Sequence, residues 1–223
     1  MQSRLLKKFF SCIVAAAIVI LIALVSGKTA EQSSQAQELN IFIDEIQRAS
    51  EQVSSFTSDF VQEKHLALFS EPVVFSGRIT VARPDRLRWE FVSPIASLLI
   101  LNGNIGIRCK EAGKPVQFNL QSDPVMRGAA EQLWLWFSGD YEKLKSLYSL
   151  QKTGENTLAV KPLTSSVSQV IGAVTIQFDG ATKQPEVVEI DETGGDYTRI
   201  IFTSYQRNPA LPDALFQKCA IDE

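Results

Sequence analysis

The chain has 223 residues, 45% of them apolar, and a formal net charge of −3 at pH 7. This composition excludes intrinsic disorder, because a chain so rich in apolar residues and so weakly charged can bury a core. It also argues against nucleic-acid binding, which needs a concentrated cationic surface. The single histidine excludes most His-based catalysis and any metal site built from several histidines.

The first thirty residues differ from the rest of the chain. An apolar run extends from Phe9 to Val25, and the residues around it are basic and never acidic: Arg4, Lys7, Lys8 and Lys28. This order is typical of a secretory signal, although the length also suits an uncleaved signal anchor, and both readings stay open. Cys12 lies at the start of the run, so it is not the acylated cysteine of a lipoprotein. We expect residues 1–30 to export the remainder to the periplasm.

Residues 31–37 are polar and are expected to form a tether, and residues 38–223 are expected to form one domain, because no repeat or linker interrupts them. Loss of the four basic residues in 1–30 would leave 18 Lys and Arg against 25 acids, a net charge of −7. It would also leave two cysteines, Cys109 and Cys219. An oxidising compartment permits a disulfide between them, and we predict one.

The spacing of apolar residues changes along the domain. Residues 39–53 follow the i, i+3, i+4, i+7 pattern of an amphipathic helix. The two following segments alternate instead, with Phe75, Ile79, Val81, Leu87, Trp89 and Phe91 on one face and Arg78, Thr80, Arg86, Arg88 and Glu90 on the other. Such alternation indicates an antiparallel sheet with one buried face and one face in solvent.

Further alternating segments raise the expected number of strands to about nine. They are separated by turn signals and cover residues 97–101, 105–109, 116–120, 158–161, 170–178, 186–191 and 197–205. Helices are expected around residues 126–137, and again over 141–148. The predicted fold class is mainly β with helices (α+β), in which one long antiparallel sheet curls into an open half-barrel and helices lie against it.

Catalytic chemistry has little support in this sequence. His65 has no partner motif and is interpreted as a surface or loop histidine, and Cys109 has no other histidine to activate it. The acids between residues 186 and 196 alternate onto the solvent face, which disfavours a glycosidase pair. We therefore predict no catalytic residues, no metal site and no cofactor.

The order of motifs resembles the periplasmic outer-membrane lipoprotein carrier proteins, the LolA-type family. Residues 55–62 are similar to its SF-x-x-x-F-x-Q opening, and residues 77–84 with Leu87-Arg88-Trp89 are similar to its G-x-[LI]-x-V-x-[RK]-P…[FL]-x-W strand pair. Pro94 with residues 97–103, and the late hairpin followed by LPDALF at 211–216, fall where the family has similar segments. The resemblance covers roughly residues 40–216.

The resemblance implies an open half-barrel closed by a helical lid, which shields the acyl chains of lipoproteins between the two membranes. A lipid-binding cavity is then expected on the inward face: Phe60, Phe75, Ile79, Val81, Leu87, Trp89, Phe91, Leu99 and Leu101. Each of these is equally compatible with ordinary core. The expected lid carries Met126, Leu133, Trp134, Trp136 and Phe137, for which core packing is again the alternative.

Arg83 is the expected latch of that lid. It shares the inward parity of Ile79 and Val81, and an arginine there is costly unless its guanidinium finds acceptors. By resemblance, the matching arginine bonds to the backbone of the lid helix and keeps the empty cavity closed. The alternative is an arginine at a strand end that extends its charged head into solvent.

The expected partners are an acylated lipoprotein or other lipid cargo, an inner-membrane transporter as donor and an outer-membrane acceptor, with no nucleic acid and a monomeric state. Residues 62–77 depart from the commonest family pattern, which puts the cargo in question. A carrier of a glycolipid, free acyl chain or polyene lipid is the first alternative. A membrane-anchored interaction domain with a filled barrel is the second, and a hydrolase is the third.

Overall fold

A computed structural model of the chain describes residues 33–110, 114–137, 139–164, 168–169 and 171–219. The chain divides into two units, Met1–Phe42 and Ile43–Glu223. In the first unit the described residues, 33–42, are helical, and in the second unit residues 43–51 are helical. The expected export signal lies outside the described residues, and none of the helices in the described part is long and apolar enough to cross a membrane.

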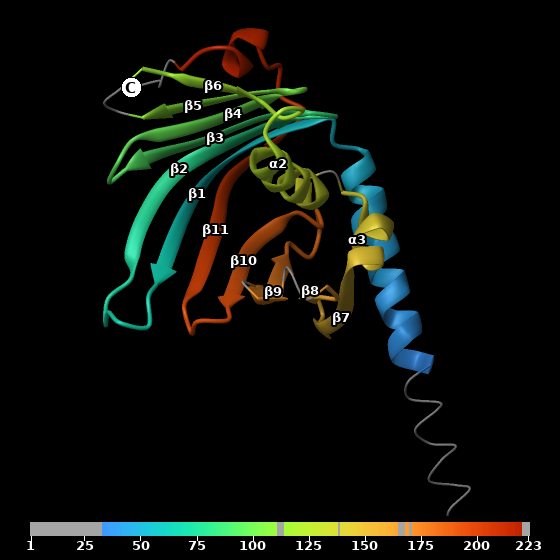
Figure 1. Ribbon diagram of the computed structural model, residues 1–223. Helices are drawn as coiled ribbons and strands as arrows, with labels where there is room; N and C mark the ends of the chain where they lie inside the picture. The colour runs from blue at the N-terminus through green and yellow to red at the C-terminus, as the bar shows by residue number, and fades with distance from the viewer. Residues whose placement is uncertain (1–32, 111–113, 138, 165–167, 170, 220–223) are drawn as a thin grey trace, which may run out of the picture. The chain divides into compact units, whose positions relative to one another are not determined.

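The second unit is built on one sheet of eleven antiparallel strands in the order β6-β5-β4-β3-β2-β1-β11-β10-β9-β8-β7. The strands are β1 (Ser55–His65), β2 (Val73–Ala82), β3 (Arg86–Ser93), β4 (Ser97–Asn102), β5 (Ile105–Lys110), β6 (Val116–Asn119), β7 (Tyr148–Gly154), β8 (Thr157–Pro162), β9 (Ile171–Phe178), β10 (Pro185–Glu192) and β11 (Tyr197–Arg207). The sheet is strongly curved and does not close on itself, since β6 and β7 are its two edges (Figure 1). The α+β half-barrel expected from the sequence is confirmed.

Two strands were not expected from the sequence, β1 and β7. The buried row of β1 contains Ser58, which interrupts the apolar alternation and is nevertheless fully buried. Its hydroxyl donates to the backbone oxygen of Thr203 at 2.8 Å, where the pairing of β1 with β11 shifts register. A polar residue satisfied by a distant strand gives no local strand signal.

The helices that accompany the sheet in the described part of the chain include α2 (Pro124–Phe137) and α3 (Tyr141–Leu147), and a 3₁₀ turn, η1 (Asp213–Phe216), follows β11. Asp123 and Asp140 start the two helices, because their side chains accept hydrogen bonds from the backbone N–H of Met126 at 3.0 Å and of Lys143 at 2.9 Å. Helix α2 lies within the concave side of the sheet (Figure 1).

The main core lies between the concave face of β1–β5 and α2. Ile79, Val81 and Leu87 are fully buried there, and so is Leu101. Their positions follow the pairing register, since Val81 faces Leu87 and Leu87 faces Leu101 across neighbouring strands. The inward side chains of α2 pack on this row and fill the space.

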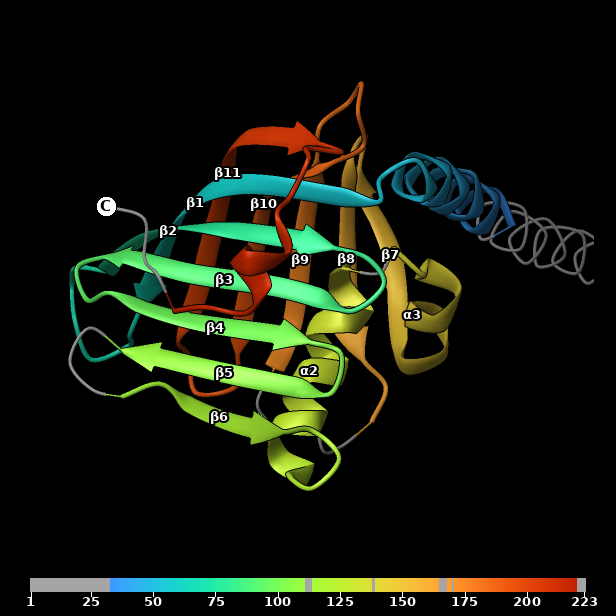
Figure 2. The ribbon, with the colours of Figure 1, turned by 90° about the horizontal axis from the view of Figure 1, so that it is seen from above.

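The convex face of β2–β5 corrects one expectation. Arg88 and Glu90 were assigned to the solvent face, but they are 3% and 7% exposed. The C-terminal segment lies over this face (Figure 2), with Phe216 buried against Leu98 and Ile100. Alternation placed the two charges on the correct face, but it carries no signal that a segment more than a hundred residues later covers that face.

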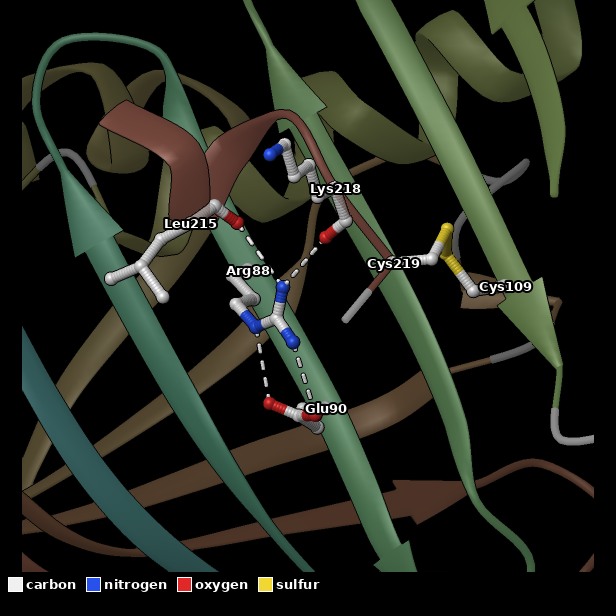
Figure 3. Close-up of a disulfide and its surroundings, with 6 residues drawn as sticks. All are labelled: Arg88, Glu90, Cys109, Leu215, Lys218 and Cys219. Carbon is white, nitrogen blue, oxygen red and sulfur yellow. Dashed lines mark hydrogen bonds and ion pairs between the residues drawn. A yellow bond between two sulfur atoms is a disulfide. The ribbon is translucent and has the colours of Figure 1, made fainter. Parts of the chain in front are cut away.

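A disulfide joins Cys109 on β5 to Cys219 in this segment, with the two Cα atoms 5.9 Å apart (Figure 3). Beside it, the guanidinium of Arg88 donates to both carboxylate oxygens of Glu90 at 3.1 Å. The same guanidinium donates to the backbone oxygens of Leu215 and Lys218 at 3.2 and 3.0 Å. The C-terminal segment is therefore held by a covalent bond and by the hydrogen bonds that the buried Arg88 guanidinium donates to its backbone.

Candidate functional site

An apolar cavity of about 430 Å³ lies on the concave side of the second unit. Its floor is formed by inward residues of the β9–β11 half of the sheet: Ile171, Val174, Ile176, Val188, Ile190, Ile200, Phe202 and Tyr205. Its other walls come from the helix end at residues 46–50, from α2 and from α3. An engineered apolar cavity of about 150 Å³ in another protein holds one benzene ring, so this volume is of the order of one long acyl chain.

The floor is apolar for a simple geometric reason. Val188 pairs with Ile176 on one side and Ile200 on the other, and Ile190 pairs with Val174, so the inward rows of three strands coincide. Several outward neighbours are polar or charged, as in the pair of Arg199 with Glu189 at 3.4 Å. Period-two alternation in each strand therefore becomes one continuous apolar surface.

The structure divides the sequence-predicted cavity residues between this site and the core. Trp89 lines the cavity, whereas Ile79, Val81, Leu87 and Leu101 are buried in the core beneath α2, and Leu99 packs against that core. Phe60, Phe75 and Phe91 form an aromatic row with Trp89 on the same face of β1–β3. Ring centroids in the row lie 5.3 Å apart between Phe60 and Phe91 and 5.8 Å apart between Phe75 and Phe91.

The predicted lid residues divide in the same way. Leu133, Trp136 and Phe137 line the cavity, while Met126 and Trp134 pack on the core side of α2. The helix thus separates a filled half of the groove from an open half. The cavity floor was missed although its strands were expected, because strand patterns do not reveal which half of a groove a helix fills.

Arg83 joins the ends of two helices at the cavity edge. One guanidinium nitrogen, Nη1, donates to the backbone oxygen of Ser50 at 2.5 Å. The other, Nη2, donates to the Ser50 hydroxyl at 2.6 Å and to the backbone oxygen of Phe137 at 3.2 Å. Both acceptors lie in the last turns of their helices, where unpaired carbonyls and the helix dipole favour a cation.

Gly139 makes this arrangement possible. It has φ +74°, and a Cβ placed on it would lie 1.8 Å from the Ser50 hydroxyl oxygen and 3.1 Å from an Arg83 nitrogen. Any larger residue would push the two bonded groups apart. The chain therefore leaves α2 by a glycine at the point where Arg83 reaches the helix end.

Ionisable groups around Arg83 are held away from water. Burial lowers the pKa of Arg83, and it raises the pKa of Tyr205 to about 12 even though the nearby Arg83 charge opposes that shift. The pKa of Tyr141, which is also buried, is raised by the same cause. Burial is the largest cause of all three shifts, so this edge of the cavity is poorly hydrated.

A second polar edge of the cavity lies at the β9–β10 turn. Lys183 Nζ lies 3.3 Å from a carboxylate oxygen of Glu45 and donates to the Asn156 side-chain oxygen at 3.0 Å. These contacts connect the turn to the helix end at residues 43–51. The cavity is thus bordered by an arginine contact at one edge and an ion pair at another.

His65 does not belong to this site. It is the last residue of β1 rather than a loop residue, and its ring stacks on Tyr197 with centroids 4.0 Å apart. Among the described residues, no three His, Cys, Asp or Glu side chains gather in a way that could hold a metal ion.

A curved open sheet with a covered apolar cavity defines the class of half-barrel proteins that can hold an apolar ligand. The chain matches the family described as "Outer membrane lipoprotein carrier protein LolA" over residues 51–219, and it belongs to that family. Residues outside this span include the helix that contributes Ser50 to the Arg83 contact.

Individual relatives agree with this assignment. The chain is 29% identical over 150 residues to an outer-membrane lipoprotein carrier protein of Dechloromonas aromatica, covering 66% of this chain and 68% of that protein. It is 24% identical over 202 residues to one from Halorhodospira halophila, covering 90% and 89%. In Chromobacterium violaceum a protein of the same name is 28% identical over 145 residues, covering 63% and 66%.

Solved structures share the fold at low identity. A crystal structure of MucB superposes with a TM-score of 0.52 at 20% identity, covering 82% of this chain and 64% of that one. An uncharacterised conserved protein of Thermus thermophilus superposes with a TM-score of 0.51 at 11% identity, covering 84% and 95%.

Proposed function

We propose that this protein is a periplasmic, non-enzymatic carrier that shields the acyl chains of a lipidated cargo in the cavity over β9–β11. The cavity itself supports this most directly, because an apolar space of about 430 Å³ is bordered by only a few polar groups. Acyl chains exposed to water cost roughly 0.8 kcal/mol for each CH₂ group, so a carrier must remove them from water. The carrier names of the relatives support the same role.

The proposed cargo is a lipoprotein taken from an inner-membrane transporter and handed to an outer-membrane acceptor. A lipoprotein with three acyl chains needs more space than the closed cavity provides. We therefore propose that α2 moves away from the sheet during uptake and that the contact of Arg83 with Ser50 and Phe137 holds the empty state closed. Uptake then breaks this contact, and release allows it to form again.

One observation favours a second candidate, a carrier of a lipid with a single chain. The volume suits one long chain without any movement of α2. The two candidates differ in the probe that they bind: a fluorescent triacylated lipopeptide for the first and a fluorescent fatty acid alone for the second.

Binding of both probes to the full chain tests the proposal. Val188→Trp places an indole in the cavity floor, and Val187→Trp is its matched control, because the neighbouring residue on β10 lies outside the cavity lining. Val188→Trp is expected to weaken binding at least about tenfold, equivalent to roughly 1.4 kcal/mol, while Val187→Trp binds as the unaltered chain does. Circular dichroism must show that both variants are folded.

Equal binding by the two folded variants would refute a carrier function at this cavity. Binding of the fatty acid but not of the lipopeptide would replace the first candidate with the second.

A further inference from the structure

Large apolar side chains are unevenly exposed in the second unit. Among its described residues eleven such side chains are exposed, and eight of them lie at one end of the contiguous strands from β6 to β11. The eight are Leu68, Phe69, Val73, Val74, Val92, Ile95, Val116 and Tyr197. They share this end because neighbouring strands are antiparallel, so that β1 and β3 finish where β2, β4, β6 and β11 begin.

The β1–β2 hairpin projects past the neighbouring strand β3 at this end. Ser76 pairs with Ser93 at the end of β3, so the three residues of β2 that precede Ser76 extend past that neighbour. At its tip Leu68 is 93% exposed and Phe69 is 66% exposed. Ile95, in the adjacent β3–β4 turn, is 65% exposed, and Figure 2 shows the two turns on the same side of the sheet.

The tip is held in this exposed arrangement by its own polar contacts. The backbone N–H of Phe69 donates to the Leu66 oxygen at 2.9 Å. The backbone N–H of Ala67 donates to the Asp196 carboxylate at 2.9 Å, which connects this turn to the β10–β11 turn. A turn that is fixed and still directs Leu and Phe into water is typical of a surface that contacts an apolar partner.

The charges at this end favour a lipid surface as that partner. Arg108, Lys110 and Lys114 are exposed near the β5–β6 end, and none of them forms an ion pair with another described residue. Exposed cations beside apolar side chains suit anionic headgroups above a hydrocarbon layer. At the hairpin tip Glu71 is exposed, so attraction by charge is expected mainly from the β5–β6 side.

The exposed end is also continuous with the cavity. Neighbouring aromatic rings link the two regions. The ring centroids lie 5.8 Å apart between Phe75 and Phe91, 6.2 Å apart between Phe91 and Trp89, and 6.1 Å apart between Trp89 and Phe137. Trp89 and Phe137 both line the cavity. An aromatic row therefore leads along the concave face from the exposed turns to the candidate binding site.

We propose that this end of the sheet docks directly on a membrane surface, with Leu68, Phe69 and Ile95 inserted among the lipids. The proposal goes beyond the carrier function, because it adds a direct contact with the bilayer that does not depend on which cargo is carried. The row from Phe75 to Trp89 then gives an acyl chain a path between the bilayer and the cavity that stays out of water.

A tryptophan at the tip reports insertion. The full chain carrying Phe69→Trp is incorporated into vesicles of phosphatidylethanolamine with a minority of phosphatidylglycerol, with or without bromine on the lipid acyl chains. Bromine quenches tryptophan only within the hydrocarbon layer. We expect the added tryptophan to lose roughly half of its emission and to shift to shorter wavelength, as interfacial insertion predicts.

Val125→Trp is the matched control, because Val125 is 79% exposed and lies in the first turn of α2, which follows the opposite end of β6. The control variant contains the same N-terminal segment as Phe69→Trp. Any quenching that arises only because this segment anchors the protein to the vesicle therefore appears in both variants. Adding Leu68→Ser and Ile95→Ser to Phe69→Trp should remove most of its quenching.

Equal quenching of Phe69→Trp and Val125→Trp would overturn the proposal. An unquenched tip would overturn it too, and is the outcome expected if this end binds a protein instead. Lipopeptide binding is measured separately on the same protein. A protein that binds the lipopeptide but does not dock on the vesicles contradicts the membrane-docking proposal and leaves the carrier function standing.

Discussion

At the residue scale, the proposed opening of the cavity depends most on the contact of Arg83 with two helix ends. Its three hydrogen bonds reach Ser50 and Phe137, which belong to different helices. A lysine could not make the same contacts, because it lacks the planar fork that reaches several acceptors at once.

Arg83→Leu is therefore expected to release the end of α2. Hydrogen exchange should show faster exchange of the α2 backbone amides, and delivery of cargo to an acceptor should slow, because the empty closed state is no longer favoured. Arg78→Leu is the control, since Arg78 bonds Asp59 at 2.7 Å on the exposed face. Release by Arg83→Leu as fast as by the unaltered chain would exclude a latch.

Gly77 shows the importance of a single missing side chain. A Cβ placed on it would lie 2.0 Å from the backbone oxygen of Glu90 and 2.7 Å from the ring of Phe60. Phe60 thus covers the glycine, and this close approach helps to build the aromatic row.

Gly77→Ala is expected to lower the free energy of unfolding by about 1–3 kcal/mol, the usual result of overpacking. Gly194→Ala is the control, because a Cβ there meets nothing within 4 Å. Urea denaturation measures both, and equal midpoints for the two variants would contradict the packing described for Phe60.

At the element scale, the C-terminal segment determines the environment of β3. Arg88 and Glu90 form an ion pair that is buried only because residues around η1 cover it. Removal of one charge leaves the other buried and unpaired, which typically costs about 3–5 kcal/mol, whereas an apolar replacement of both is much better tolerated.

Glu90→Leu alone should therefore destabilise the protein strongly, and the double variant Arg88→Met with Glu90→Leu should recover much of the loss. Thermal denaturation of Glu90→Leu, of Arg88→Met and of the double variant shows whether the loss of stability in the double variant is smaller than the sum of the two single losses. Equal or additive losses would mean that the C-terminal segment does not exclude water from this pair.

The disulfide between Cys109 and Cys219 adds to the same element. It closes a loop with a sequence separation of 110 residues. Such a loop gives a stabilisation of up to roughly 4–5 kcal/mol in the chain-entropy account. Reduction should lower the urea midpoint of the native protein and leave that of Cys219→Ser unchanged, and a midpoint insensitive to reduction would contradict the structural role.

The sequence predicted elements better than it predicted what covers them. Alternation from Phe75 to Phe91 placed Ile79 and Leu87 inward because that information is local. It could not show that Arg88 is buried or that α2 fills the β2–β4 half of the groove, since both depend on segments far along the chain. The expected cavity residues were therefore inward-facing, and most of them lie in the core instead.

At the scale of the whole molecule, the second unit is asymmetric in a way that matters for function. One half of its concave face is packed against α2 and provides stability, whereas the other half leaves the cavity open. The exposed apolar turns border the packed half, and the aromatic row crosses from these turns to the cavity. The packed core, the proposed entry path and the proposed binding site for acyl chains thus occupy different parts of a single sheet.

The central claim is that acyl chains bind over β9–β11, and photo-crosslinking tests it most directly. A triacylated lipopeptide with a diazirine in one acyl chain is bound to the full chain, irradiated and mapped by mass spectrometry of the labelled peptides. We predict labels on β9, β10 and β11, at peptides that contain Val174, Val188 and Phe202. Labels confined to peptides of β2–β4, or spread equally over exposed segments, would contradict the account.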